Sequence, residues 1–116
     1  MSIKRINPGP RMSPAVIHNG IAYLAGQVSQ NAAGKSVGEQ TKDILSIIDG
    51  LLKEAGTDKS KLLTTNIWLS DISTFAEMNA AWDAWVSPGN TPARATVEAK
   101  LAAPQFTVEI MVTAAI

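Results

Sequence analysis

An arginine and a glutamate near the C-terminal end are the residues best suited to carry chemistry. Arg94 follows a Pro-Gly-Asn-Thr-Pro loop and stands among small apolar residues. Its guanidinium presents five donors in a rigid fork, which suits bidentate capture of a carboxylate. A surface arginine with a solvated head is the alternative, and the local pattern leaves both interpretations open.

Glu109 interrupts the segment Phe-Thr-Val-Glu-Ile-Met-Val, in which nearly every other residue suits burial. A carboxylate among apolar neighbours can hold or exchange a proton near neutral pH, as a general acid or base does. The alternative is a glutamate at a strand edge that faces water. Glu98 and Lys100, on the preceding strand, are expected to form a pair in solvent.

The remaining polar residues are weaker candidates. His18 is the only histidine, so any Ser-His-Asp triad must use it and a multi-histidine metal site is excluded. It is interpreted as a residue that flanks a turn. Asn79 interrupts the apolar side of a helical pattern and is assigned a structural role, capping strand or loop backbone through its amide. Core positions are predicted for the three tryptophans, Trp68, Trp82 and Trp85.

Composition limits both the fold and the class of function. The 116 residues are 46% apolar, which at this length allows one core. Ten Lys+Arg balance ten Asp+Glu, which argues against binding to nucleic acid or to anionic lipid. The absence of cysteine excludes disulfides, zinc ribbons and thiol nucleophiles. With no apolar run of membrane-spanning length and no signal-peptide apolar region, the chain is expected to be cytoplasmic.

Two segments carry strong local signals. Residues 15–25 predict two short strands joined at Asn19-Gly20, because Asn-Gly between apolar runs is typical of a hairpin. Ser36 and Glu39 have the spacing of a capping box, and apolar residues then recur at helical intervals as far as Gly56. The pattern predicts a helix of about 18 residues between that cap and that glycine.

The rest of the chain alternates between strand and helix patterns. Residues 61–69, 93–101 and 106–115 predict strands, and a second helix is predicted from a cap at Thr74 to Pro88-Gly89. The resulting order, β-β-α-β-α-β-β, is an α+β pattern. Residues 1–116 are therefore interpreted as a single domain, with one mixed sheet and two helices on one face.

The predicted strands leave one face of the sheet without cover. Residues 21–25 are apolar on both sides of the strand, which is typical of strands buried on both faces. No third helix is predicted that could cover the second face. We therefore expect other subunits to cover it.

At these positions the sequence resembles the Rid proteins, the reactive intermediate deaminases also called YjgF-like. The similarity extends over essentially the whole chain in element order, length and landmarks. Its most specific part is Pro92-Ala93-Arg94-Ala95-Thr96-Val97, then Lys100, then Val108-Glu109-Ile110 at the expected interval. Ala25-Gly26-Gln27 and Phe75-Ala76-Glu77-Met78-Asn79 add to it.

The resemblance implies a chorismate-mutase-like fold assembled as a homotrimer, with clefts between neighbouring subunits. Active members hydrolyse reactive 2-imino or enamine acids to 2-oxo acids and ammonia, with no metal or organic cofactor. Carried over by position, Arg94 is expected to bind the substrate carboxylate, and Glu109 to act as the acid/base group that positions and activates water. Gly26 and Thr96 would line the same cleft.

Three positions depart from the archetypal members of the family. Met12 or one of its neighbours stands where they carry a tyrosine, Ala25 where they carry a serine, and Thr96 where they often carry a cysteine. Because the phenol and the serine hydroxyl are lost, the cleft is expected to be more apolar, and either to accept a different or bulkier imine or to turn over weakly.

Two further hypotheses remain beside the deaminase. A non-catalytic trimer could bind small carboxylates in the same cleft and act as a sensor or as a module for a protein partner. RNA cleavage or inhibition of translation is the other, and the neutral charge and the single histidine argue against it.

Overall fold

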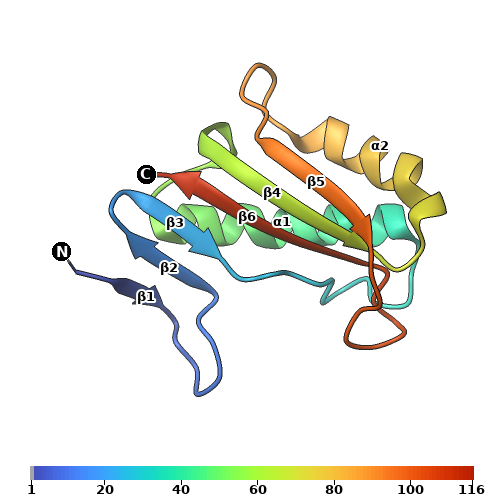
Figure 1. Cartoon of the computed structure of the whole chain (residues 1–116), viewed down its shortest axis with the longest axis horizontal. Helices are drawn as coiled ribbons and strands as arrows, with labels where there is room; N and C mark the ends of the chain where they lie inside the picture. The colour runs from blue at the N-terminus through green and yellow to red at the C-terminus, as the bar shows by residue number, and fades with distance from the viewer. Residues whose placement is uncertain (1) are drawn as a thin grey trace.

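A six-stranded sheet forms the centre of the structure, a computed structural model that describes residues 2–116. Along the chain the strands are β1 (Lys4–Ile6), β2 (Ala15–His18), β3 (Ile21–Leu24), β4 (Leu62–Leu69), β5 (Ala93–Glu98) and β6 (Val108–Ala115). Their spatial order is β1-β2-β3-β6-β4-β5 (Figure 1). Neighbouring strands run antiparallel except β4 and β5, which are parallel. The expected mixed sheet is confirmed.

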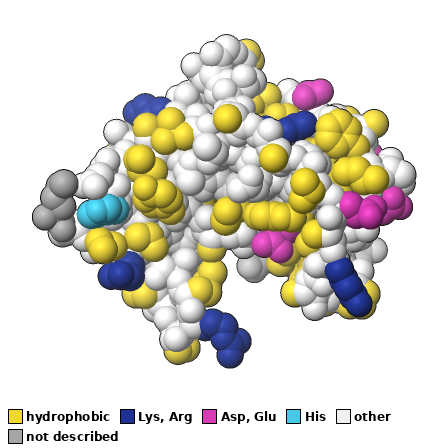
Figure 2. All heavy atoms as spheres, in the orientation of Figure 1, with side chains coloured by type: hydrophobic (Ala, Val, Ile, Leu, Met, Phe, Trp, Pro, Cys, Tyr) yellow, Lys and Arg dark blue, Asp and Glu magenta, His cyan; other side chains and the backbone are white. Residues whose placement is uncertain are grey.

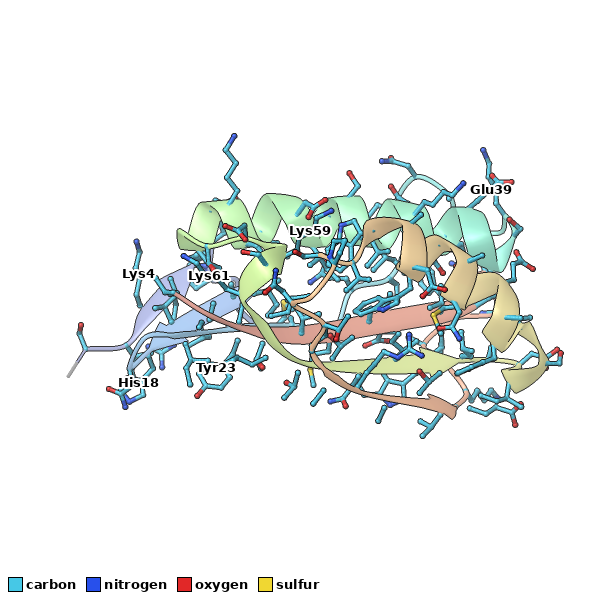
Figure 3. The ribbon with its side chains drawn as sticks, turned by 90° about the horizontal axis from the view of Figure 1, so that it is seen from above. Lys4, His18, Tyr23, Glu39, Lys59 and Lys61 are labelled. Carbon is cyan, nitrogen blue, oxygen red and sulfur yellow. The ribbon has the colours of Figure 1, made fainter. Side chains whose placement is uncertain are left out.

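Two helices pack on one side of this sheet, as the view from above shows (Figure 3). Helix α1 (Val37–Ala55) begins where the Ser36 hydroxyl accepts the Glu39 N–H at 3.2 Å, and it ends at Gly56, whose φ of 86° lies in the left-handed region. Helix α2 (Phe75–Trp85) packs beside α1. The short 3-10 turns η1 (Lys59–Lys61) and η2 (Ile72–Thr74) precede β4 and α2. Neither helix of residues 2–116 is long and apolar enough to cross a membrane.

Several predicted boundaries were wrong. The sheet has an additional strand, β1, which pairs with β2 and has no apolar alternation of its own. The strand predicted over 93–101 ends at Glu98, and the strand predicted from residue 106 begins at Val108. Thr74 makes no side-chain cap at α2, because its hydroxyl instead donates to the Asp71 carbonyl in the preceding turn.

The core lies between the helices and the sheet. Alternate residues of β6 are buried there, and α1 contributes a stripe of fully buried side chains that includes Ile44 and Ile48. Trp82 and Met78 of α2 join the same core. The predicted helical stripes are therefore confirmed as the faces that pack on the sheet.

On the opposite face of the sheet, no helix or strand of residues 2–116 lies over the strands (Figure 1). This face carries the intervening residues of each strand, among them Tyr23, which is 45% exposed, and Val97, which is 50% exposed. Figure 2 shows this face, with hydrophobic side chains spread over the strands. A large exposed apolar area usually marks a site where a protein contacts another molecule.

Candidate functional site

Arg94 lies on the edge strand β5, and its side chain points to the helix side of the sheet. Its Nη1 donates a hydrogen bond of 2.8 Å to the Asn79 Oδ1 of α2. The guanidinium carbon lies 5.4 Å from the ring centroid of Trp82 and 5.8 Å from that of Phe75. Cation–π contact and one neutral amide therefore orient the half-buried guanidinium.

Two threonine hydroxyls lie close to Arg94 in the strand register. Thr65 of β4 lies directly opposite Arg94 in the pairing of β4 with β5. Thr96 follows Arg94 by two residues and lies on the same side of β5. Both hydroxyls are buried, and neither has a hydrogen-bond partner within residues 2–116. Buried polar atoms rarely lack a partner in native proteins, so these two hydroxyls have a hydrogen-bonding capacity that the described residues do not use. Arg94 and Thr65 also line a shallow hollow of about 260 Å³.

Glu109 lies at the start of β6, on the open face of the sheet. Its cross-strand partner is Trp68, which is half-buried on that face and so does not occupy the predicted core position. The Glu109 side chain extends over Gly26, where a Cβ atom would collide with its Oε2. Glycine at position 26 therefore makes room for the carboxylate.

Within one chain, Arg94 and Glu109 point away from each other. Arg94 pairs with Thr65, whereas Glu109 pairs with Trp68, three residues further along β4. Because side chains alternate between the faces of a strand, this odd offset places the two groups on opposite faces of the sheet. The guanidinium and the carboxylate can share a pocket only if a second copy of the chain brings one to the other.

Two of the other predicted site residues, Gly26 and the adjacent Ala25, lie beside Glu109. The Ala25 N–H donates to the Pro14 carbonyl at 2.9 Å, which ties the β1–β2 loop to the segment before Gly26. Met12 lies on that loop and is 51% exposed. Gln27 and Ile110 exchange two backbone hydrogen bonds, of 2.8 and 3.0 Å, which attach the same segment to β6. The structure thus divides the six predicted residues into an Arg94–Thr96 group and a Glu109–Gly26–Ala25 group with Met12 on the adjoining loop.

Asp43 of α1 holds the loop that continues from Gly26. Its Oδ2 accepts the Ser29 hydroxyl at 2.7 Å and the backbone N–H groups of Gln30 and Asn31 at 2.9 and 3.0 Å. The hydrogen bonds from Asn31 and then Ser29 keep the pKa of the Asp43 carboxyl below its ordinary value. The charged form of Asp43 therefore stabilises the loop.

We expect Asp43→Asn to lower the free energy of unfolding by about 1 kcal/mol at pH 7, a typical net value for one hydrogen bond. A carboxyl whose pKa is lowered by folding stabilises the fold above its unfolded pKa of about 3.9 and loses that effect as the pH falls through the folded value. The penalty should therefore shrink in urea titrations performed between about pH 5 and pH 3. An equal penalty at every pH would contradict the role of the charge, and Asp83→Asn on α2 is the matched control.

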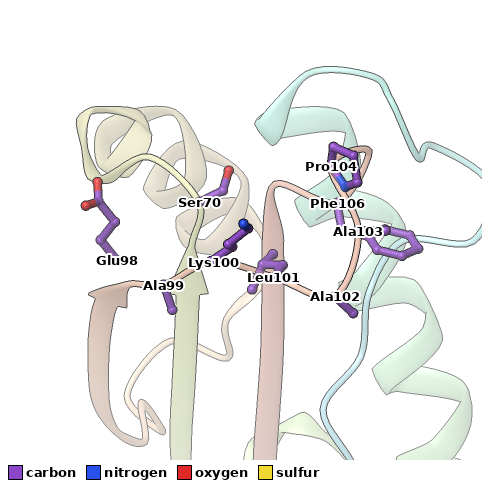
Figure 4. Close-up of a pocket in the computed structure, with 9 residues that line it drawn as sticks. All are labelled: Ser70, Glu98, Ala99, Lys100, Leu101, Ala102, Ala103, Pro104 and Phe106. Atoms are coloured by element: carbon purple, nitrogen blue, oxygen red, sulfur yellow. The ribbon is translucent and has the colours of Figure 1, made fainter.

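A wider hollow of about 750 Å³ lies at the carboxyl ends of β4 and β5 (Figure 4). Ser70, Glu98, Lys100 and Phe106 are among the residues that line it, and none of the six predicted site residues is. Glu98 Oε1 accepts the Ile72 N–H at 3.0 Å, so this carboxylate holds the turn before α2. Within residues 2–116, no group of three or more His, Asp or Glu side chains is arranged to hold a metal ion.

The role predicted for Asn79 was incomplete. Its amide oxygen accepts a hydrogen bond from the Arg94 guanidinium and not from strand or loop backbone. Asn79 therefore positions the cation of the candidate site. A polar residue on the apolar side of a helix was a usable signal, but its partner lies 15 residues away on a strand. Trp82, predicted as a core residue, is buried and also packs on that guanidinium.

Comparisons with known proteins place the chain among close relatives. A family model described as Endoribonuclease L-PSP matches residues 2–116. A RutC family protein of Haemophilus influenzae is 48% identical over 114 residues, which is 98% of both chains. The RutC family protein YoaB of Escherichia coli is 44% identical over 116 residues, the full length of both.

Solved structures agree with the fold. A member of the YjgF protein family from Neisseria meningitidis superposes with a TM-score of 0.95 at 48% identity, covering 99% of this chain and 95% of that one. A member of the YjgF/YER057c/UK114 family from Mycobacterium tuberculosis gives a TM-score of 0.88 at 25% identity, covering 99% and 100%.

Proposed function

Because the chain belongs to the RutC/YjgF family, the Rid proteins, we propose that it is a cytoplasmic homotrimer that hydrolyses reactive 2-imino or enamine acids to 2-oxo acids and ammonia. The observation that carries the proposal is the way Arg94 is held. An amide and two aromatic rings orient its guanidinium, and no carboxylate of residues 2–116 is hydrogen-bonded to it. The guanidinium therefore keeps donors free for the carboxylate of a substrate.

The proposed chemistry needs only a fixed substrate, a water molecule and a group that moves protons. Water attacks the protonated imine carbon, a C–O bond forms, and the C=N electron pair moves to nitrogen. Glu109 accepts a proton from the attacking water and returns it to the nitrogen. The C–N bond then breaks as the carbonyl forms, while Glu109 accepts the proton of the carbinolamine hydroxyl and passes it to the departing ammonia, so that ammonium and the 2-oxo acid are released. Orientation by Arg94 and proton transfer by Glu109 together suit an imine that is already electrophilic.

A second copy of the chain supplies the geometry that one chain lacks. Arg94 lies on β5, an edge strand, and Glu109 lies on the open apolar face. A neighbour that packs its open face beside this edge would bring its own Glu109 toward Arg94. The same contact would bury Tyr23 and Val97, which are half-exposed in the single chain. The proposed trimer therefore accounts for both the divided site and the uncovered face.

The trimer can be tested by light scattering at micromolar concentration, where we expect a single species of three times the 12.3 kDa chain. Val97→Lys places a charge on the apolar face and should shift the population to smaller species. Ile72→Lys, at a position that is 44% exposed and lies in η2 outside the sheet, is the matched control and should leave the mass unchanged. A monodisperse monomer for the unmodified chain would contradict the proposal.

The activity can be tested with imines generated in place by an amino-acid oxidase and trapped with semicarbazide. We expect the protein to lower the rate of semicarbazone formation, because it consumes the imine first. Met12 and Ala25 give the cleft fewer polar groups, so imines with larger apolar side chains should be preferred: the leucine-derived imine over the alanine-derived one. No effect on any imine would contradict the deaminase proposal.

RNA cleavage is not supported by the residues of this chain. The description of the matching family model names an endoribonuclease. The net charge here is zero, and the single histidine, His18, contacts the Ser2 carbonyl at the end of β2. A protein that binds the phosphate backbone of RNA normally carries a basic surface. The equal numbers of basic and acidic residues in this chain do not indicate such a surface.

A further inference from the structure

A hollow of about 290 Å³ lies on the outer side of the molecule, between the two helices. Its lining comes from α1, α2 and η1: Lys42, Leu45, Lys59, Ala81, Ala84 and Trp85. Leu45 and Ala81 are buried and form an apolar floor. None of the residues assigned to imine hydrolysis lines this hollow, which we call the helix groove.

Trp85 forms one wall of the helix groove and is held by three neighbours. Its Nε1 donates a hydrogen bond of 3.0 Å to the Asp49 carboxylate, and its ring lies 5.4 Å from that of Trp82. The Lys59 Nζ lies 5.2 Å from the Trp85 ring centroid. An indole fixed in this way presents a preformed apolar surface with a cation beside it.

The lining of the helix groove carries two positive charges. Two of the six lining residues, Lys42 and Lys59, carry ammonium groups, and none carries a carboxylate. Asp49 lies outside this lining and keeps its charge, and its carboxylate is oriented by the hydrogen bond from the Trp85 indole. Apolar walls with a few charged groups are typical of sites for small molecules, and this volume suits a ligand at the lower end of that range.

We propose that the helix groove binds a small carboxylate with an aromatic or aliphatic body. The body lies on Leu45, Ala81 and the Trp85 ring, and the carboxylate pairs with the ammonium groups of Lys42 and Lys59. This site is separate from the one at Arg94, although Trp82 packs against both Trp85 and the Arg94 guanidinium. It does not depend on the assignment of deaminase activity.

Phenylacetate is a suitable probe, and NMR of the indole N–H signals of the full chain is a suitable readout. We expect phenylacetate to shift the Trp85 signal, which is identified by its loss in Trp85→Phe. Replacing both Lys42 and Lys59 with alanine should weaken binding about tenfold, the effect of two exposed charge pairs. The matched control removes two exposed lysines elsewhere, Lys4 and Lys35, and should bind as tightly as the unmodified chain.

Two further comparisons distinguish the helix groove from the site at Arg94. Phenylacetamide lacks the negative charge of phenylacetate. Its affinity for the unmodified chain should therefore be no higher than the affinity of phenylacetate for the double lysine variant. Arg94→Ala should leave the phenylacetate shift of Trp85 in place. Loss of the shift in Arg94→Ala, an unchanged affinity in the double lysine variant, or no shift at millimolar phenylacetate would each overturn the proposal, whatever the outcome of the deaminase assay.

Discussion

Arg94→Ala is expected to lower kcat/KM for imine hydrolysis by about a hundredfold or more. A hydrogen bond to a charged group contributes about 1.5–3 kcal/mol, and the lost orientation of the substrate adds to this. The Asn79 amide and the two aromatic rings hold the guanidinium in the unmodified chain, so the variant loses a prepositioned group and not a mobile one. Initial rates of semicarbazone formation, with and without protein, measure the change.

Three further variants define what the Arg94→Ala result means. Arg94→Lys keeps the charge but loses the planar fork, so it should recover only part of the activity. Asn79→Ala should raise KM more than it lowers kcat, because it loosens the guanidinium without removing it. Lys53→Ala, on an exposed position of α1, should behave as the unmodified chain.

The alternative of a carboxylate-binding module makes a different prediction. If imine loss is equal for the unmodified chain and Arg94→Ala, while only the unmodified chain binds 2-oxobutyrate by calorimetry, the protein binds carboxylates without hydrolysing imines. In crystals soaked with 2-oxobutyrate, its carboxylate should lie against Arg94. Density for it elsewhere, with the guanidinium unoccupied, would contradict the assignment of Arg94.

The parts of the fold that could be predicted depend on local signals. Asn19 and Gly20 both adopt positive φ, 52° and 75°, which is the reason that Asn-Gly specifies the hairpin. Ser36 and Gly56 bound α1 through their own backbone and side-chain contacts. In each case the residues that carry the signal are neighbours in sequence. The order of the elements other than β1, and the core faces of the helices, followed from such signals.

Strand β1 lacked any signal of that kind. It consists of three residues, of which Lys4 and Arg5 are exposed and only Ile6 is buried. It is an edge strand that pairs with β2 alone, so its existence depends on a partner that is already in place. A pattern of alternating apolar residues cannot develop over so short a segment. Such strands are determined by tertiary contacts and not by local composition.

The site was predictable in its residue types but not in its arrangement. Arg94 and Glu109 stood out because a charged group interrupts an apolar segment. Their placement on opposite faces depends on the register of β5 and β6 against β4, which no local pattern determines. The Asn79–Arg94 hydrogen bond likewise joins a helix to a strand. Contacts between elements decide which functional groups share a pocket, and within one chain they place Arg94 and Glu109 on opposite faces.

Glu109→Gln is the second variant with a large expected effect, a loss of about 10²–10⁴ in kcat for imine hydrolysis. Glutamine keeps the shape of the side chain and one acceptor oxygen, but it can neither accept the proton of water nor return it to nitrogen. Binding of 2-oxobutyrate should stay within about twofold, because Arg94 supplies the carboxylate contact. A kcat that is unchanged in Glu109→Gln would remove this residue from the mechanism.

Gly26→Ala tests the position of the same carboxylate without removing a polar group. The added methyl would occupy the place of the Glu109 Oε2, so the carboxylate must move and kcat should fall although Glu109 is still present. Gly50→Ala in α1 is the matched control, because nothing lies within 4 Å of its added methyl and alanine favours a helix. It should keep full activity and unfold at the same or a higher temperature. If Gly26→Ala retained full activity while Glu109→Gln lost it, the proton would be transferred from a position other than the one over Gly26.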